Sequence, residues 1–502
     1  MPSTCLSSNS FLHNKVPLVR RLGAEFRGPE RLHLRVIARE NLHLGGAISD
    51  SVHLGACQAA LPSDRFSPAR RRDRPFTPPA TPDYDGRVNR LDQTDQDQLL
   101  ERFIRYARIE TTSDRHVRDI PSTQSQWDLL KLLVKELMDL GLSDVELTKN
   151  GYLISRIPSN IEGKARPVIG LMAHIDTASD APGDRVNPQI HRDYNGGVIE
   201  VGEGFRLDPA EFPELTRYKG GTIVTTDGRT LLGADDKAGV AEIMTAVAWI
   251  QGHPELKHGT LEIIFTPDEE TGKGLDLFPV EKLTARCCYT VDGTVEGTVE
   301  AECFNAYQVH ATFTGRVIHL GYARGRLVNA VSMAGAFLNM LPQAESPEAT
   351  DGRFGYYCPV EVRGTLETAT VDVFLRDFDE QEMKRRIGAL HDMACAVEGI
   401  FPGGKVVLTE TKQYSNMYQS IQRDPLAVDL ALEAIKMAGC EARLELIRGG
   451  TDGSKLTEMG IPTPNLFSGA QNYHSRSEWV GFSTMVKATE TILNLAELWG
   501  RQ

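Results

Sequence analysis

The sequence is poor in cysteine, and it contains no long uninterrupted apolar run. Only 8 of its 502 residues are cysteine, and none has a CxxC spacing, so neither a disulfide framework nor a thiolate metal site is expected. Cys287 and Cys288 lie inside an apolar, strand-like run. We interpret them as reduced core thiols, which favours a cytoplasmic location. No stretch of about 18 uncharged apolar residues occurs, so no membrane partner is predicted.

An excess of basic residues is also missing. The net charge is −13 at pH 7, which argues against nucleic acid as the main partner. Hydrophobic residues make up 41% and charged residues 25% of the chain, as is usual for a soluble globular protein. A chain of this length is long for a single hydrophobic core, so two or three units are expected.

Residues 1–90 differ from the rest of the chain. They hold 14 Lys and Arg against 8 Asp and Glu, together with nine of the 26 prolines. Helical and strand periodicity is poor there, so this segment is predicted to be a disordered N-terminal extension. The alternative is an organelle transit peptide, which is rich in Arg and Ser and poor in acids. The acids Glu25, Glu30 and Glu40 weaken that alternative.

From about residue 91 onward, helical patterns alternate with short apolar runs. Apolar runs at 168–173, 260–266 and 287–291 read as buried strands, and residues 236–251 repeat their apolar side chains with the helical period. Amphipathic helices are predicted near residues 95–106 and 122–140. Helices that alternate with apolar strands indicate an α/β fold, with a sheet covered on both sides.

Residues 304–414 read as a separate unit. Their pattern is strand, helix, strand, strand, helix, strand, with Asp379 as the expected N-cap of the second helix. This β-α-β-β-α-β order is the ferredoxin-like α+β arrangement. The unit interrupts the α/β pattern, which resumes at residue 415. The predicted domains are therefore 91–303 and 415–502, forming one catalytic domain, with 304–414 inserted as a lid domain.

Several of the predicted strands end in acidic or imidazole side chains. His174 and Asp176 follow the first strand, Glu269 and Glu270 follow the second, and Asp292 ends the third. Two further segments, GADDK at 233–237 and YHS at 473–475, add Asp235 and His474. In α/β folds the carboxyl ends of strands form the site. Five of these side chains are candidate ligands: His174, Asp235, Asp292, His474 and one of the two glutamates. Because all five are nitrogen or oxygen donors, they suit Zn²⁺ and tolerate Mn²⁺ or Co²⁺.

Neighbouring acids are expected to have different tasks. If the backbone is extended at Glu269 and Glu270, their side chains point to opposite sides, so one can bind a metal while the other holds the catalytic proton. A carboxylate such as Asp235 can bridge two cations about 3.5–4 Å apart. Each segment alone is weak and could be a surface pair, a helix cap or an acidic loop. The simplest chemistry that the whole set supports is a two-metal hydrolase.

Longer motifs make the set far more specific. The chain resembles the peptidase T family of tripeptide aminopeptidases, which lies in the zinc aminoacylase and carboxypeptidase superfamily of di-zinc peptidases. The resemblance extends from about residue 95 to the C-terminus. The matching stretches are VNPQI at 186–190, TTDGRTLLGADDKAG at 225–239, FTPDEETGKG at 265–274, RDFD at 376–379, IRGGTDGSKL at 447–456 and PNLF at 464–467.

The resemblance implies a fold and roles for individual residues. It implies a di-zinc peptidase catalytic domain with a mixed sheet flanked by helices, plus the inserted lid, and two Zn²⁺ per chain. Glu269 would be the general base, Asp176 would orient His174, and the bond between Asp235 and Asp236 would be cis. One zinc would be held by His174, Asp235 and Asp292, and the other by Asp235, Glu270 and His474.

The resemblance also implies substrate-binding residues, but the chain departs from the family motif in one segment of the lid. Family members usually carry His-Pro-Gly followed by Thr-Ala-Lys-Gly, whereas this chain has HLGYARG at 319–325. His319 survives as a candidate oxyanion donor. Arg376 is a candidate for gripping a peptide's terminal carboxylate, with an interdomain salt bridge as the alternative. Asn416 and Arg448 complete the candidate substrate-binding set.

Three functions therefore compete. The first is an aminopeptidase that hydrolyses tripeptides in the cytoplasm and whose architecture allows a homodimer. The second is a carboxypeptidase or N-acyl amino-acid deacylase of the same superfamily, because ligand spacing alone does not separate these enzymes. The third is a metal- or peptide-binding protein without catalysis, against which the retention of Glu269 and every ligand argues.

Overall fold

The computed structural model describes residues 90–502. The N-terminal extension predicted for residues 1–90 lies, except for its last residue, outside these described residues. Within residues 90–502, no helix is both long and apolar enough to cross a membrane.

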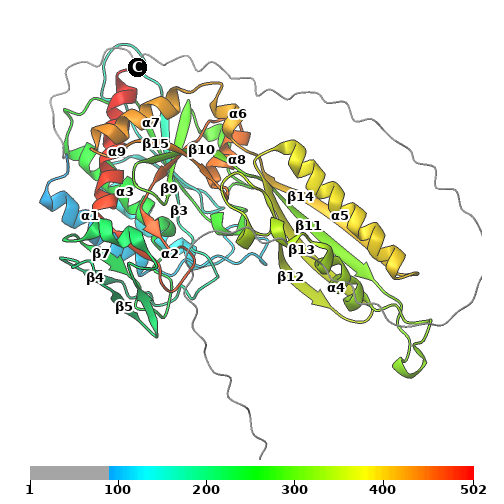
Figure 1. Ribbon diagram of the computed structural model, residues 1–502. Helices are drawn as coiled ribbons and strands as arrows, with labels where there is room; N and C mark the ends of the chain where they lie inside the picture. The colour runs from blue at the N-terminus through cyan, green and yellow to red at the C-terminus, as the bar shows by residue number, and fades with distance from the viewer. Residues whose placement is uncertain (1–89) are drawn as a thin grey trace, which may run out of the picture. The chain divides into compact units, whose positions relative to one another are not determined.

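A mixed eight-stranded sheet forms the centre of the main domain (Figure 1). Its parallel pairs are β3–β8, β3–β9, β9–β16 and β10–β15. Along β3, Leu171 and Ala173 belong to one apolar core, whereas Met172 belongs to another. The sheet is therefore covered on both faces. Its strands, in spatial order, are β1 (Asp144–Leu147), β2 (Leu153–Ile157), β8 (Leu261–Thr266), β3 (Ile169–His174), β9 (Cys287–Gly293), β16 (Asn465–Phe467), β10 (Thr298–Cys303) and β15 (Arg443–Ile447).

Long helices bury one of these faces. The helices α1, α3 and α9 pack against one another, and α7 packs against α9. Helix α3 is buried almost all round because it lies between the sheet and the other helices. The α/β class, with a mixed sheet flanked by helices, is confirmed. The helices of this part are α1 (Gln93–Ala107), α2 (Gln126–Asp139), α3 (Ala234–Gly252), α6 (Tyr418–Ile421), α7 (Leu426–Met437), α8 (Asp452–Glu458) and α9 (Phe482–Gly500).

The helix expected from residue 122 begins four residues later than predicted. Segment 113–125 forms turns, and the Ser122 hydroxyl binds Asp268 instead of capping a helix. The sequence also gave no sign of two small sheets beside the main one. These sheets comprise β4 (Gln189–His191), β7 (Ile223–Thr225), β17 (Ala470–Gln471) and β18 (Trp479–Gly481), and the pair β5 (Ile199–Gly202) and β6 (Phe205–Leu207).

A second, four-stranded antiparallel sheet has the order β12-β13-β11-β14 and its own apolar core. The chain order is β11 (Asn305–Thr314), α4 (Ala330–Met340), β12 (Tyr356–Gly364), β13 (Thr368–Asp377), α5 (Glu380–Ile400) and β14 (Lys405–Tyr414). This is the predicted β-α-β-β-α-β order, and Asp379 accepts the expected N-cap hydrogen bonds from Gln381 and Glu382. The exact domain boundaries at 303/304 and 414/415 stay a prediction.

The two faces of this lid sheet differ in character. On β13, Val371, Val373 and Leu375 point into the core beneath α4 and α5. The alternating side chains of Phe374 and Arg376 point to the opposite face, because strand side chains alternate. That face lines a cleft described below.

Candidate active site

The predicted ligands come from five separate places in the fold. His174 ends β3, Asp292 lies near the end of β9, and Glu270 follows β8. These three strands are parallel neighbours, so their carboxyl ends meet at one edge of the sheet. Asp235 lies at the start of α3, and His474 lies in the loop between β17 and β18.

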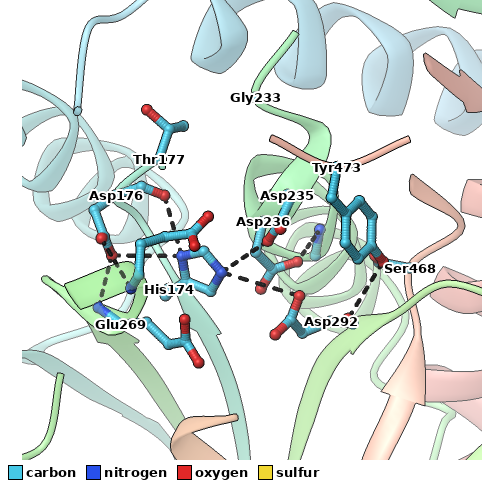
Figure 2. A network of polar contacts seen from close by, with 12 residues as sticks. His174, Asp176, Thr177, Gly233, Asp235, Asp236, Glu269, Asp292, Ser468 and Tyr473 are labelled. Carbon is cyan, nitrogen blue, oxygen red and sulfur yellow. Dashed lines mark hydrogen bonds and ion pairs between the residues drawn. The ribbon is translucent and has the colours of Figure 1, made fainter. Parts of the chain in front are cut away.

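The structure brings all five side chains together around Asp235. One Asp235 oxygen, Oδ1, lies 2.9 Å from His174 Nε2, and the other, Oδ2, lies 3.3 Å from His474 Nε2. Glu270 Oε2 lies 2.9 Å from His474 Nε2, and Asp292 Oδ1 lies 3.9 Å from His174 Nε2. Figure 2 shows His174 between Asp176 on one side and Asp235 and Asp292 on the other. Asp235 thus presents one oxygen to each histidine, as a bridging carboxylate does.

The backbone at Asp235 has the expected form. The Asp235–Asp236 peptide bond is cis, as the family resemblance implies. Gly233, with φ of 74°, turns the chain into α3, and an added Cβ there would lie 3.2 Å from Thr177 Cγ2. Glycine therefore suits both the left-handed backbone and the close approach.

Asp176 contacts more of the site than the sequence predicted. Its Oδ1 lies 3.4 Å from His174 Nδ1, consistent with orienting that ring. The same carboxylate also accepts a hydrogen bond from the backbone N–H of Glu269 at 3.0 Å (Figure 2). It accepts another from the backbone N–H of Glu270 at 3.2 Å. Asp176 therefore joins the end of β3 to the loop that carries both glutamates.

The expectation of extended backbone at Glu269 and Glu270 was wrong. Both residues lie in a short 3₁₀ turn, Glu269–Thr271, entered through Asp268 with φ of 59°. Asp268 is fully buried and accepts hydrogen bonds from Ser122 N (2.6 Å) and Gln126 Nε2 (2.8 Å). Among the described residues, Glu270 forms an ion pair with a histidine, His474, and Glu269 forms none.

Burial and close charges shift the acid–base properties of the site. Burial raises the pKa of Glu269 well above its usual value, and the neighbouring acids Asp452 and Glu270 raise it further. Burial and the Asp235 charge raise the pKa of Glu270 to about 7. For His474, burial acts to lower the pKa, but hydrogen bonds to Asp235 and Glu270 outweigh it and raise the pKa to about 11. The pKa of Glu269 is thus shifted in the direction expected of a carboxylate that accepts a proton near neutral pH.

The donor set fits a metal centre. Two groups of three residues each have their donor atoms within 4.8 Å of one another. The first group is His174, Asp235 and Glu270, and the second is His174, Asp236 and Asp292. Glu270 Oε1 and Asp236 Oδ2 are buried and have no hydrogen-bond partner. Unpaired buried carboxylate oxygens are costly unless a cation or proton reaches them. Imidazole and carboxylate donors at this spacing are suited to Zn²⁺ and related divalent ions.

Some residues of the site escaped the sequence analysis. Asp236 shares a donor triplet with His174 and Asp292. Asp452 is buried and accepts a hydrogen bond of 2.6 Å from Thr266, at the end of β8. Asp180 Oδ2 lies 3.5 Å from His474 Nδ1. The acidic residues of DD at 235–236 and GGTDG at 449–453 were visible, but their contacts depend on tertiary structure.

A cleft of about 680 Å³ opens beside the metal donors. Glu269, Glu270 and His474 line it from the main domain. From the lid, Arg376 lines it with its guanidinium held between the rings of Phe374 and Tyr414, 5.0 Å and 5.6 Å from their centroids. Arg376 Nη1 also donates to the Leu375 carbonyl at 3.0 Å. No salt bridge involving Arg376 is seen among residues 90–502, so the interdomain ion pair considered as its alternative is not what holds it.

The other three substrate-binding candidates do not line this cleft. His319 is the N-cap of the exposed turn Leu320–Tyr322, and its Nδ1 accepts from Gly321 N. The Asn416 amide donates to the Phe378 carbonyl at 3.2 Å. Arg448 donates to the carbonyls of Gly352 (3.0 Å) and Phe354 (3.1 Å). Their roles toward substrate stay predictions, and the contacts of Asn416 and Arg448 give them structural tasks at the base of the lid.

Comparison with known proteins identifies the family. The model of "Peptidase family M20/M25/M40" matches residues 224–498. Peptidase T of Geobacillus kaustophilus is 44% identical over 404 residues, covering 80% of this chain and 98% of the relative. Peptidase T of Clostridium perfringens is 42% identical over 405 residues, covering 81% of this chain and all of the relative.

Solved structures agree at the level of the fold. A tripeptidase from Staphylococcus aureus superposes with a TM-score of 0.65 at 21% identity, covering 81% of this chain and 99% of that one. Aminopeptidase PepT from Bacillus cereus gives a TM-score of 0.63 at 21% identity, with the same coverage. The chain belongs to peptidase family M20/M25/M40 and, within it, to the peptidase T group.

Proposed function

We propose that the protein is a metal-dependent aminopeptidase that removes the N-terminal residue from tripeptides. The observation that carries this proposal is the position of Asp235, whose two carboxylate oxygens face His174 and His474 separately. The peptidase T relatives, aligned over nearly their whole length, support the same activity. Small peptides are then the partners, and hydrolysis is the reaction.

The proposed cofactor is a pair of Zn²⁺ ions. His174 and Asp292 would hold one, Glu270 and His474 would hold the other, and Asp235 would contact both. When bound, the ions would supply Lewis acidity toward a water molecule and toward the peptide carbonyl. Two ions (+4) against the three ligand carboxylates (−3) would leave the centre slightly positive, which suits the developing negative charge of the reaction.

Glu269 performs the proton transfers in this proposal. Its carboxylate takes a proton from the attacking water and then delivers it to the nitrogen of the leaving amine. Burial, followed by the neighbouring acids, raises the pKa of Glu269, which is the direction that favours proton uptake by a carboxylate. Asp176 contributes by holding the Glu269 backbone N–H at 3.0 Å while it contacts the His174 ring. The base and the metal ligand are thereby fixed relative to each other.

Residues of the lid and the cleft would select the substrate. Arg376 is restrained by two aromatic rings, so its fork would bind a terminal carboxylate with little loss of side-chain freedom. Arg376 and Glu269 line the same cleft of about 680 Å³, a volume that would suit short peptides. Asp180, beside His474, places negative charge near the position of a substrate's terminal ammonium group. His319 is proposed to donate to the oxyanion, and a homodimer and a cytoplasmic location are part of the same proposal.

An assay with matched substrates tests this function. The purified protein is expected to cleave Ala-Ala-Ala, to leave Ala-Ala and N-acetyl-alanine essentially uncut, and to lose activity with a chelator until Zn²⁺ is restored. Preferential release of acetate from N-acetyl-alanine would favour the deacylase alternative. Release of the C-terminal residue from a labelled tripeptide would favour the carboxypeptidase. Metal binding without any cleavage would leave the non-catalytic alternative.

A further inference from the structure

A buried carboxylate outside the ligand set connects two parts of the metal centre. Glu478 is 1% exposed and stands at the base of the loop between β17 and β18. It lies four residues after His474 in the chain. Its carboxylate forms hydrogen bonds with the segment that leads into α3, more than 240 residues earlier in the chain.

All of the hydrogen bonds accepted by this carboxylate come from the backbone around Asp235. Glu478 Oε2 accepts from the N–H groups of Leu232 at 2.7 Å and Gly233 at 2.9 Å. Glu478 Oε1 accepts from the N–H of Asp235 itself at 3.1 Å. Three converging backbone donors satisfy a buried carboxylate well and fix the conformation of the segment that supplies them.

The loop that carries Glu478 is itself braced. The Ser475 hydroxyl donates to the Asn472 carbonyl at 2.7 Å, and Asn472 Nδ2 donates to the Ser477 carbonyl at 3.2 Å. Trp479, next to Glu478, pairs with Thr225 between β18 and β7. A rigid loop transmits the position of Glu478 to His474.

We infer that Glu478 is a positioning residue that sets the separation between Asp235 and His474, and so prepares the site for its metal ions. This inference rests on the proposed function, in which both residues are ligands. The two side chains lie 3.3 Å apart, and the Glu478 carboxylate bonds the loop that carries His474 to the backbone that carries Asp235. Glu478 acts through the backbone of Leu232, Gly233 and Asp235, because its carboxylate bonds those N–H groups and neither histidine.

The variant Glu478→Gln tests this directly. A glutamine offers one oxygen and one NH₂ group. Either the N–H groups of Leu232 and Gly233 or the N–H of Asp235 then face a donor and lose their hydrogen bonds. Glu262→Gln is the matched control. Glu262 is also fully buried and also accepts backbone N–H groups, from Thr284 (3.0 Å) and Ala285 (3.1 Å), but it lies away from the ligands.

The readout is the affinity of the full-length, metal-stripped protein for zinc, measured by competition with a chromophoric chelator. Glu478→Gln is expected to weaken zinc binding by about 10- to 100-fold, while Glu262→Gln binds zinc as the wild type does. Glu478→Asp, which keeps the charge but shortens the reach, is expected to fall between them. Unchanged affinity in Glu478→Gln, or an equal loss in Glu262→Gln, would overturn the inference.

A second measurement covers the case in which Glu478→Gln does not fold. In the metal-stripped wild-type protein, hydrogen exchange of the Leu232, Gly233 and Asp235 amides is expected to be slow, because the carboxylate holds them before any metal arrives. Fast exchange there would overturn the inference. Failure of the wild type to bind zinc or to cleave tripeptides would instead count against the proposed function, so the two failures are distinguishable.

Discussion

At the scale of single residues, the proposed metal ligand Glu270 and the proposed proton carrier Glu269 differ in one side-chain contact. Both backbone N–H groups donate to Asp176, but the Glu270 side chain also lies 2.9 Å from His474 Nε2. Adjacent glutamates therefore receive different tasks from one short turn. This difference makes the general-base assignment testable without disturbing the metal donors.

The variant Glu269→Gln is expected to lower kcat for tripeptide hydrolysis by about 10²- to 10⁴-fold, because the proton acceptor is lost. Zinc content should be unchanged, because Glu269 is not among the proposed ligands. Glu270→Gln should differ by losing zinc as well as activity. The paired comparison uses steady-state kinetics and metal analysis of the same preparations, and near-normal kcat in Glu269→Gln would exclude it as the base.

A partly buried acid, Glu300, also predicts how stability depends on pH. Glu300 on β10 accepts a hydrogen bond of 2.7 Å from Asn465, whose Oδ1 in turn accepts from the Asp292 N–H at 3.1 Å. Burial raises the pKa of Glu300 to about 7. Between its unfolded pKa of about 4.3 and this value, the folded protein holds a proton that the unfolded chain has lost. Stability is therefore full below the lower value and falls as pH rises through the higher one.

Glu300→Gln should remove this dependence. Between pH 5 and pH 8 in the presence of a chelator, the wild type is expected to lose on the order of 2 kcal/mol more unfolding free energy than the variant. Denaturant unfolding at the two pH values measures the difference. If the unfolding free energies of the two proteins change equally with pH, Glu300 is not the cause of the pH dependence.

At the scale of elements, the turn that bears Glu269 is held by a segment far away in sequence. Asp268 accepts hydrogen bonds from Ser122 and Gln126, at the start of α2. The Ser122 hydroxyl also accepts from Asp114 N at 2.8 Å. The beginning of α2 is thus part of the support for the catalytic turn.

Ser122→Ala removes the hydroxyl from this arrangement. The expected cost is about 1–3 kcal/mol of unfolding free energy, because a buried carboxylate loses a hydrogen bond, together with a several-fold fall in kcat. Ser125→Ala, in the same segment, is the control because Ser125 makes no cap hydrogen bond. Thermal unfolding and kinetics check both, and equal behaviour of the two variants would contradict the role of Ser122.

At the scale of the whole molecule, the element order of the lid and three central strands were predictable from the sequence, whereas the small sheets and the full convergence of the site were not. Apolar runs ending at His174, Glu269 and Asp292 indicated parallel strands, because burial on both faces demands such runs. The positions of Asp180, Asp452 and Glu478 depend on loops packed across the sheet, for which a sequence has no periodic signal. The 3₁₀ turn at Glu269 was missed because short apolar periodicity does not specify the backbone after a strand.

Arg448 of the main domain forms hydrogen bonds with backbone carbonyls of the lid. Arg448 binds carbonyls at Gly352 and Phe354 and lies over the rings of Phe304 and Tyr356, 5.4 Å and 5.8 Å from their centroids. Arg448→Ala should speed hydrogen exchange in residues 350–356 even without substrate. A raised KM with unchanged exchange would instead support direct substrate binding by Arg448.

The central claim is that Asp235 lies between two metal ions, and anomalous diffraction at the zinc edge tests it most directly. Crystals of the zinc-loaded protein should show two peaks about 3.5–4 Å apart, one beside His174 and Asp292 and the other beside Glu270 and His474, with an Asp235 oxygen on each. A single peak, or two peaks with Asp235 bound to neither, would contradict the account.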